Sequence, residues 1–400
     1  MYNRCYLWLQ HRNLRGNDLT KIKRFRTKYI DASLWRRQKV IGHGNWEASR
    51  YDPKEAREFE DHQEVTVRKP KAHRQLYRNV RVQMIDEEPE LARTAENLLN
   101  KLVELTGILP DGLFVNGVKR LGDNPVAGGG FADVWKGEIR GTSVALKVIR
   151  VYDLDIEFQK DCYKEVIVWR NICHPNVMPF IGVNVDIFKP RIALISPWMD
   201  NGHMLCYLKK HPGADRQKMI YEISLGLHYL HSRRPKVIHG DLRANNVLID
   251  DLGCARIGDF GLVRIEDTLT SKAGSSFSGC GSLRWQAPEL LCPFLFDLRG
   301  APCRITEQTD IYAFACVCLE AFTGQPPFAH LREPAVVSEV GFLGKHPSRP
   351  GELGEDGSVQ DAIWSVMSSC WSRQPSERPS SSQVAETLET ISTRFALSSS

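Results

Sequence analysis

The sequence lacks any long apolar run. No stretch approaches the ~18 uninterrupted apolar residues that a membrane-spanning helix needs, so we do not expect the chain to cross a bilayer. The start of the chain also lacks an apolar core of signal-peptide length, because Arg4, His11 and Arg12 interrupt it. The same stretch contains arginine and is poor in acidic residues, so a mitochondrial presequence stays open as an alternative.

Cysteine pairs at metal-binding spacing are also absent. The 11 cysteines are scattered, and none forms a C-x-x-C pair. Cys316 and Cys318, the nearest two, lie in an apolar, helix-like run, which predicts buried, reduced thiols. With 42% hydrophobic and 25% charged residues the composition is that of an ordinary globular protein, and reduced thiols favour the cytoplasm.

The charge is unevenly spread along the chain. Residues 1–81 hold 20 Lys or Arg against 9 Asp or Glu, which is +11, so the remainder must total −6 to give the net charge of +5. Residues 1–85 have no sustained periodicity, which predicts a basic, poorly ordered extension. Binding of this arm to nucleic acid or to an anionic membrane surface stays open as an alternative.

A helical pattern follows the basic extension. From Glu87 to Leu105, Leu and Ala recur at helical spacing, and Gly107 and Pro110 end the pattern. We therefore predict an amphipathic helix and a linker over residues 86–120, packed on the outside of the domain that follows.

Two short polar clusters stand close together in the second half of the chain. The first is His-Gly-Asp at 239–241 with Asn246, and the second is Asp-Phe-Gly at 259–261. The apolar residues between them alternate as in a short hairpin, which would hold both clusters on one rigid base. A carboxylate can accept a proton, and carboxylate and amide oxygens are hard ligands of the kind that Mg²⁺ binds.

This arrangement resembles the H-R-D-L-x-x-x-N and D-F-G loops of the protein kinases. The resemblance covers residues 121–395 and is to the tyrosine-kinase-like group. It implies an α+β, bilobal fold: a small N-lobe over 121–198, mainly antiparallel β with one helix, and a larger, mainly α-helical C-lobe over 199–395. By the same resemblance Asp241 receives the substrate's proton, Asn246 and Asp259 bind Mg²⁺, and Arg243 contacts the γ-phosphate.

A glycine cluster after Leu121 is followed by two β-like runs, the second ending in Val-Ala-Leu-Lys at 144–147. This resembles the kinase Gly-rich loop and the V-A-I-K strand. Ala127 and Ala132 stand at the first and third glycine positions of that loop. Gly128, Gly129 and Gly130 can still supply the mobile backbone that must approach phosphates.

The remaining nucleotide contacts are implied by the same resemblance. Lys147 is expected to hold the phosphates and to pair with Glu165, although a solvated Glu165 is an alternative. A hinge is expected beside Ser196; Pro197 has no N–H, so adenine would use the carbonyl there and the Met199 amide. The residues expected to contact ATP are Ala127, Gly128, Gly129, Gly130, Val134, Ala145, Lys147, Glu165, Ser196, Trp198, Met199 and Leu248.

The resemblance also implies roles in regulation and in holding the fold together. Gly240 stands where many kinases have the arginine that pairs with a phosphorylated activation loop, which favours a kinase independent of that phosphorylation. Asp310 is expected to anchor the catalytic loop, Glu289 to pair with Arg378, and the segment 281–289 to dock the substrate.

The resemblance thus implies a Mg·ATP-dependent kinase acting on serine and threonine of protein substrates. The wording Asp-Leu-Arg-Ala-Asn-Asn at 241–246 leaves dual specificity open. A nucleotide-binding pseudokinase scaffold is the rival interpretation, favoured by the altered glycine positions and by Gly240.

Overall fold

The computed structural model describes residues 103, 109–128, 132–150, 163, 166–234, 236–259, 264–265, 283–296, 305–351 and 357–398. Several predictions lie outside them: the basic extension, nearly all of the Glu87–Leu105 helix, the residues Gly129, Gly130 and Glu165, and residues 281–282 of the segment expected to dock the substrate. Within the described residues, no helix combines the length and apolarity that crossing a membrane requires.

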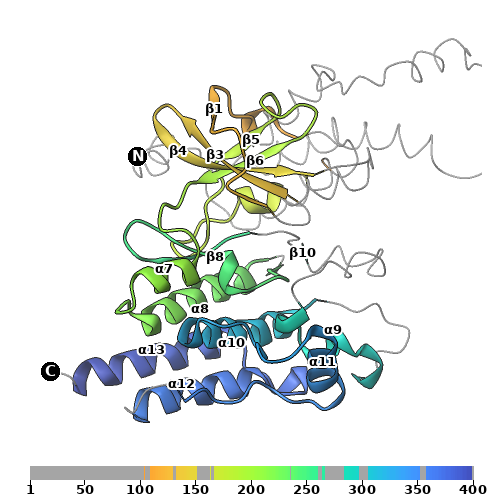
Figure 1. The fold of residues 1–400 in the computed structure, drawn as a ribbon, viewed down its shortest axis with the longest axis vertical. Helices are drawn as coiled ribbons and strands as arrows, with labels where there is room; N and C mark the ends of the chain where they lie inside the picture. Colours follow the sequence, from red (N-terminus) through yellow and green to blue (C-terminus); the bar gives the residue numbers. More distant parts are fainter. Residues whose placement is uncertain are drawn as a thin grey trace, which may run out of the picture. The chain divides into compact units, whose positions relative to one another are not determined.

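Six strands form one antiparallel sheet (Figure 1) in the order β1-β3-β4-β6-β5, with β2 paired to β3. Their bounds are β1 Val118–Leu121, β2 Ala127–Gly128, β3 Ala132–Ile139, β4 Thr142–Ile149, β5 Gly182–Asn184 and β6 Ala193–Pro197. The two runs predicted after the glycine cluster are β3 and β4. They meet at Arg140 and Gly141, which both have positive φ (51° and 82°), as a tight hairpin turn requires.

The sheet begins earlier than the predicted N-lobe boundary at 121. Only Val118 of β1 is buried, and the three residues after it are exposed. The sequence here therefore lacks the alternating apolar pattern that would predict a strand. Upstream, the Val115 N–H donates to the Val183 carbonyl at 2.9 Å. Gly182 allows this close approach, because a Cβ there would lie 2.6 Å from the Leu113 carbonyl oxygen.

Helices make up most of the rest of the domain (Figure 1), together with two short two-stranded sheets, β7 Val237–Ile238 with β10 Arg264–Ile265 and β8 Val247–Ile249 with β9 Ala255–Ile257. Their bounds are α7 Met204–Lys210, α8 Arg216–Ser232, α9 Pro288–Leu291, α10 Glu307–Thr323, α11 Glu333–Val336, α12 Gly357–Cys370 and α13 Ser381–Ser398. Residues 166–170 add a helical stretch between β4 and β5. The predicted α+β fold, with an antiparallel sheet and a helical lobe, is confirmed.

Helix α10 runs through the centre of the helical lobe. Its side chains are buried from Thr309 to Ala321, including Cys316 and Cys318, as predicted for these thiols. The helix begins at a capping box, in which the Thr306 N–H donates to Thr309 Oγ1 at 3.0 Å, and it ends at Gly324 with φ of 66°. This burial makes α10 a rigid base for the loops that contact it.

Candidate active site

Asn246 of the first polar cluster and Asp259 of the second lie at the base of one hairpin, as predicted, while Phe260 and Gly261 lie outside the described residues. Strands β8 (Val247–Ile249) and β9 (Ala255–Ile257) pair antiparallel, with Val247 opposite Ile257. The Gly258 N–H donates to the Asn246 carbonyl at 2.8 Å, which joins the residue before β8 to the residue after β9. The hairpin therefore fixes Asn246 close to the backbone that leads into Asp259.

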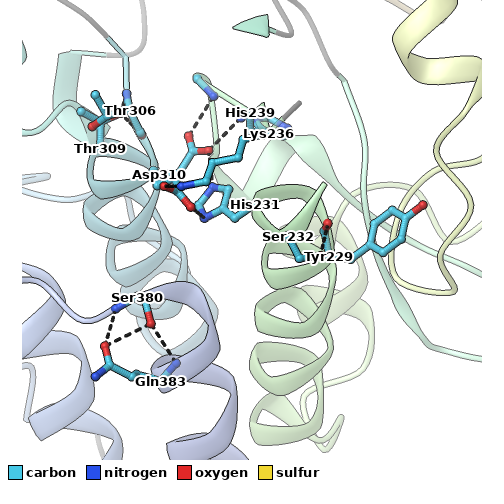
Figure 2. Close-up of polar contacts among 12 residues, drawn as sticks. Tyr229, His231, Ser232, Lys236, His239, Thr306, Thr309, Asp310, Ser380 and Gln383 are labelled. Atoms are coloured by element: carbon cyan, nitrogen blue, oxygen red, sulfur yellow. Dashed lines mark hydrogen bonds and ion pairs between the residues drawn. The ribbon is translucent and has the colours of Figure 1, made fainter. Parts of the chain in front are cut away.

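The loop before the hairpin is anchored by Asp310 of α10, as the resemblance implied. The Asp310 carboxylate accepts from the His239 N–H at 2.7 Å and from the Gly240 N–H at 2.8 Å. Figure 2 shows the same carboxylate reaching His231 of α8, whose Nε2 lies 3.0 Å from Asp310 Oδ2. Asp310 is 1% exposed, so these contacts are shielded from water and hold the loop firmly.

Asp241 lies between the anchored residues and the hairpin. The Asn246 side-chain amide donates to the Asp241 carbonyl oxygen at 2.7 Å and to its Oδ2 at 3.0 Å. Arg243 Nε lies 3.6 Å from the same Oδ2 and forms no hydrogen bond with the described residues. The amide nitrogen of Asn246 is thus occupied by Asp241, and its Oδ1 remains as an acceptor.

Gly240 has a structural role that the sequence did not reveal. Its φ is 77°, a conformation that L side chains rarely adopt. A Cβ at this position would also lie 3.2 Å from Ile305 Cδ1. An arginine here would be strained, so glycine fits the local backbone as well as removing a charge.

Lys147 of β4 forms an ion pair with Asp259. Burial opposes the negative charge of Asp259, but Lys147, together with His239 and Arg243, outweighs it and lowers the pKa of this carboxyl. Asp259 has φ of 56°, an uncommon conformation for a residue with a side chain. The predicted Lys147–Glu165 pair lies outside the described residues.

The strand register gathers the predicted nucleotide residues on one face of the sheet. Ala127 is opposite Val134, Val134 is opposite Lys147, and Ala145 is opposite Ser196. Opposite residues in adjacent strands, and alternate residues within a strand, share a face. Val134, Ala145, Lys147 and Ser196 are all half-buried, whereas Leu146 and Ile195 on the other face are fully buried.

The hinge follows β6. The Trp198 N–H donates to the Ser143 carbonyl at 3.3 Å, so the sheet uses this amide and does not leave it for a base. Among the described residues nothing accepts from the Met199 N–H, while the Met199 carbonyl accepts from Gly202 at 3.0 Å. Leu248, also predicted to contact ATP, lies on β8 and is bridged to His203 just beyond the hinge.

The ion pair expected between Glu289 and Arg378 is present and buried. Arg378 Nη1 lies 2.6 Å from Glu289 Oε1, and Nη2 lies 2.7 Å from Oε2, which is a bidentate pair. It ties the start of α9 to the segment before α13 and so serves the scaffold.

Glu320 of α10 is a residue near the site that sequence reasoning missed. It is 2% exposed and accepts a hydrogen bond from the Ala244 N–H at 2.9 Å. The signal was a single acidic residue inside the apolar run IYAFACVCLEAF, because a buried carboxylate requires partners. The run alone could not indicate which groups those partners are.

Comparison with known proteins yields one family. The family model "protein tyrosine and serine/threonine kinase" matches residues 122–388. The serine/threonine-protein kinase CTR1 of Arabidopsis thaliana is 28% identical over 272 residues, 66% of this chain and 31% of that protein. The probable serine/threonine-protein kinase drkB of Dictyostelium discoideum is 29% identical over 270 residues, 66% of this chain and 36% of the relative.

A further relative is the dual specificity protein kinase pyk3 of Dictyostelium discoideum. It is 29% identical over 276 residues, which make up 68% of this chain and 18% of that protein. The chain thus matches about a third or less of the length of each of these three curated relatives.

Proposed function

This chain belongs to the protein tyrosine and serine/threonine kinase family, and we propose that it transfers the γ-phosphate of ATP to serine and threonine hydroxyls of other proteins. The observation that carries the proposal is the convergence of Asp241, Asn246, Asp259 and Lys147. Two loops and strand β4 bring these four residues together, although Lys147 and Asp259 lie 112 positions apart in the sequence.

Asp241 is the residue we assign to the substrate hydroxyl. Asn246 holds one of its carboxylate oxygens, and the Asp310 anchor fixes the backbone just before it, so the carboxylate is oriented before a substrate arrives. Such a carboxylate can accept the hydroxyl proton as the oxygen attacks phosphorus. Arg243, with its Nε 3.6 Å from Asp241, is suited to stabilise negative charge beside it.

The donor set fits Mg²⁺ and ATP. Asn246 Oδ1 and the Asp259 carboxylate are hard oxygen ligands of the kind Mg²⁺ binds, and Lys147 beside Asp259 is suited to hold phosphate oxygens. Bound Mg²⁺ would neutralise phosphate charge during transfer. The half-buried sheet face, with Val134, Ala145 and Ser196, is available to the base and ribose, and the Met199 N–H is the hinge donor we assign to adenine.

The substrate class follows the names of the relatives. CTR1 and drkB carry serine/threonine-protein kinase in their names, and pyk3 is named as a dual specificity kinase. We assign serine and threonine as the main acceptors and keep tyrosine as an outcome of the test. Reduced, buried thiols and the use of ATP favour the cytoplasm. Binding of nucleic acid or lipid by the basic arm gains no support from the comparisons.

Labelled ATP·Mg²⁺ and a generic basic protein substrate test the proposal, followed by identification of the labelled amino acids. We expect label on serine and threonine, and a loss of about 100-fold or more in Lys147→Met, because a charge that holds the transferring phosphate is removed. Nucleotide binding without any transfer would establish the pseudokinase scaffold instead. Label on tyrosine as well would establish dual specificity.

A further inference from the structure

Glu320 contacts two segments that the proposed reaction needs. Its Oε2 accepts from the Ala244 N–H at 2.9 Å and from Trp285 Nε1–H at 2.8 Å. Ala244 lies between Asp241 and Asn246 in the catalytic loop. Trp285 ends the short helix Leu283–Trp285 in the segment expected to dock the substrate. One buried oxygen therefore touches both the catalytic loop and the docking segment.

The catalytic loop is held at two points by carboxylates of the same helix. Asp310 binds the amides of His239 and Gly240, and Glu320 binds the amide of Ala244. The two acids are ten positions apart on α10, a span of roughly 15 Å along a helix. The backbone on either side of Asp241 is therefore fixed to α10, and Glu320 fixes the side nearer to the docking segment.

The docking segment has a second attachment that does not involve the catalytic loop. Arg284 Nη1 donates to the Phe328 carbonyl at 2.5 Å, and Nη2 donates to the Leu331 carbonyl at 2.7 Å. These contacts hold the segment to the turn after α10. They do not connect it to the catalytic loop. Within the described part of the chain, Glu320 is the side chain that hydrogen-bonds to both segments.

We propose that Glu320 is a positioning residue that couples the docking segment at Trp285 to the catalytic loop at Ala244, an inference that rests on the proposed kinase function. The coupling needs no phosphate. This suits a loop in which glycine, at position 240, stands in place of the arginine that would pair with a phosphorylated activation loop. Glu320 is 2% exposed, and it acts through the two groups that it binds.

The surroundings of Glu320 make this coupling sensitive to pH. Burial raises the pKa of Glu320 to about 7, against the lowering effects of the Ala244 N–H, the Trp285 N–H and the charge of Arg243. Among the described residues the thiol of Cys316, on the same helix, also interacts with Glu320, and burial raises the pKa of this thiol far above neutrality. A neutral carboxylic acid accepts weaker hydrogen bonds than a carboxylate does, so the link weakens as pH falls below about 7.

Steady-state kinetics of Glu320→Leu, Glu320→Gln and Trp285→Phe test the coupling. In Glu320→Leu we expect kcat/KM for a peptide substrate to fall about tenfold or more, with KM for ATP changed less than about twofold. Glu320→Gln keeps an acceptor oxygen without the charge, so it should retain most activity at pH 6 and lose the wild-type rise between pH 6 and pH 8. Trp285→Phe should lower kcat/KM in the wild type but add little to Glu320→Leu, because both remove one shared contact.

Glu222 offers a matched control. It is a buried glutamate of α8 whose Oε2 accepts from a backbone amide, that of Ala255, at 2.7 Å, outside the loop and the docking segment. Glu222→Leu should lower stability while leaving kcat/KM of the folded protein near the wild-type value. Equal kinetic losses in Glu222→Leu and Glu320→Leu would overturn the proposal, since they would reduce the effect of Glu320 to general destabilisation.

A second readout separates this proposal from the proposed function. Amide hydrogen exchange at Ala244 should accelerate in Glu320→Leu, and less so in Glu320→Gln, whether or not phosphate is transferred. If the wild-type protein transfers nothing, the proposed function fails, and exchange at Ala244 and around Trp285 still decides the coupling. Unchanged exchange at both places in Glu320→Leu would overturn the coupling itself.

Discussion

The catalytic loop and the strand pair around the glycine cluster are held in different ways. The catalytic loop is fixed by buried polar side chains. The carboxylate of Asp310 holds its start, the carboxylate of Glu320 holds its second half, and the amide of Asn246 holds its central aspartate. Strand β2 pairs with β3 over only two residues, Ala127 and Gly128, and both are exposed. One loop depends on specific side chains in the core, and the other on backbone pairing at the surface.

This difference explains where the sequence can depart from the kinase pattern. The backbone hydrogen bonds of an exposed strand do not depend on the side chain. Alanine at position 127 can therefore stand in place of glycine. Buried carboxylates tolerate no such change, because each leaves donors unpaired if removed. Within the same exposed strand, Gly128 is the tighter position, since a Cβ there would lie 3.2 Å from Arg150 Nη2 and from Asp133 Oδ1.

The largest effect should come from Asp310→Asn. The change places an amide group against the His239 and Gly240 N–H groups and His231, so at least one buried donor loses its acceptor. We expect a loss of roughly 2–4 kcal/mol in the free energy of unfolding, measured by urea denaturation. We also expect phosphate transfer to fall further than the folded fraction does.

Glu222→Gln is the control for that prediction, since it also perturbs a buried acid that accepts a backbone amide. It should lower stability without lowering the activity per folded molecule. If Asp310→Asn keeps the wild-type activity per folded molecule, the carboxylate anchor is not what orients the loop.

An effect of similar size on stability, confined to one pH window, is expected from the ionisation of Glu320. Its pKa of about 7 lies above the ordinary value of 4.5, so the folded protein retains a proton that the unfolded chain has already lost between pH 4.5 and 7. The contribution of this group to the unfolding free energy therefore falls as pH rises through that window, by roughly 3 kcal/mol for a shift of this size. Urea denaturation of wild type and Glu320→Gln at pH 5 and pH 8 measures it: the stability of the wild type relative to the variant should fall at pH 8. A difference that stays constant would show that Glu320 titrates normally.

The smallest effect should come from Ala127→Gly on the exposed strand β2. Glycine increases backbone freedom, which costs roughly 0.5–1 kcal/mol in a strand. Restoring glycine at this position should change the affinity for ATP by less than about threefold, because the neighbouring glycines already provide a mobile backbone. Isothermal titration with ATP·Mg²⁺ checks this; a tenfold gain would mean that Ala127 limits the approach to the phosphates.

The parts of the fold that the sequence predicted depend on short-range patterns. The hairpin that joins Asn246 to Asp259 follows from alternating apolar residues, and the position of Lys147 follows from a β-like run after a glycine cluster. Strand β1 escaped prediction because it is charged and buries only Val118. Its place in the sheet depends on pairing with β3, and this pairing cannot be predicted from the local sequence pattern.

Contacts distant in the sequence account for what was missed at the site. Glycine is favoured at 240 because φ there is 77° and because a Cβ would lie 3.2 Å from Ile305 Cδ1. Ile305 follows the docking segment in the sequence, so the local sequence around Gly240 does not show this contact. The role of Glu320 depends on Ala244 and Trp285, which lie 76 and 35 positions away in the chain. A single acidic residue in an apolar helix indicated that partners exist, but only the tertiary structure identifies them.

The central claim is that Asp241, held by these anchors, receives the substrate's proton during phosphate transfer. Single-turnover transfer from labelled ATP·Mg²⁺ to a protein substrate, compared between wild type and Asp241→Asn, tests it most directly. Asparagine preserves the shape of the side chain but cannot accept the proton as a carboxylate does, so we expect the rate to fall by about 10²–10⁴ with nucleotide affinity unchanged. Equal rates in the two proteins would contradict the claim.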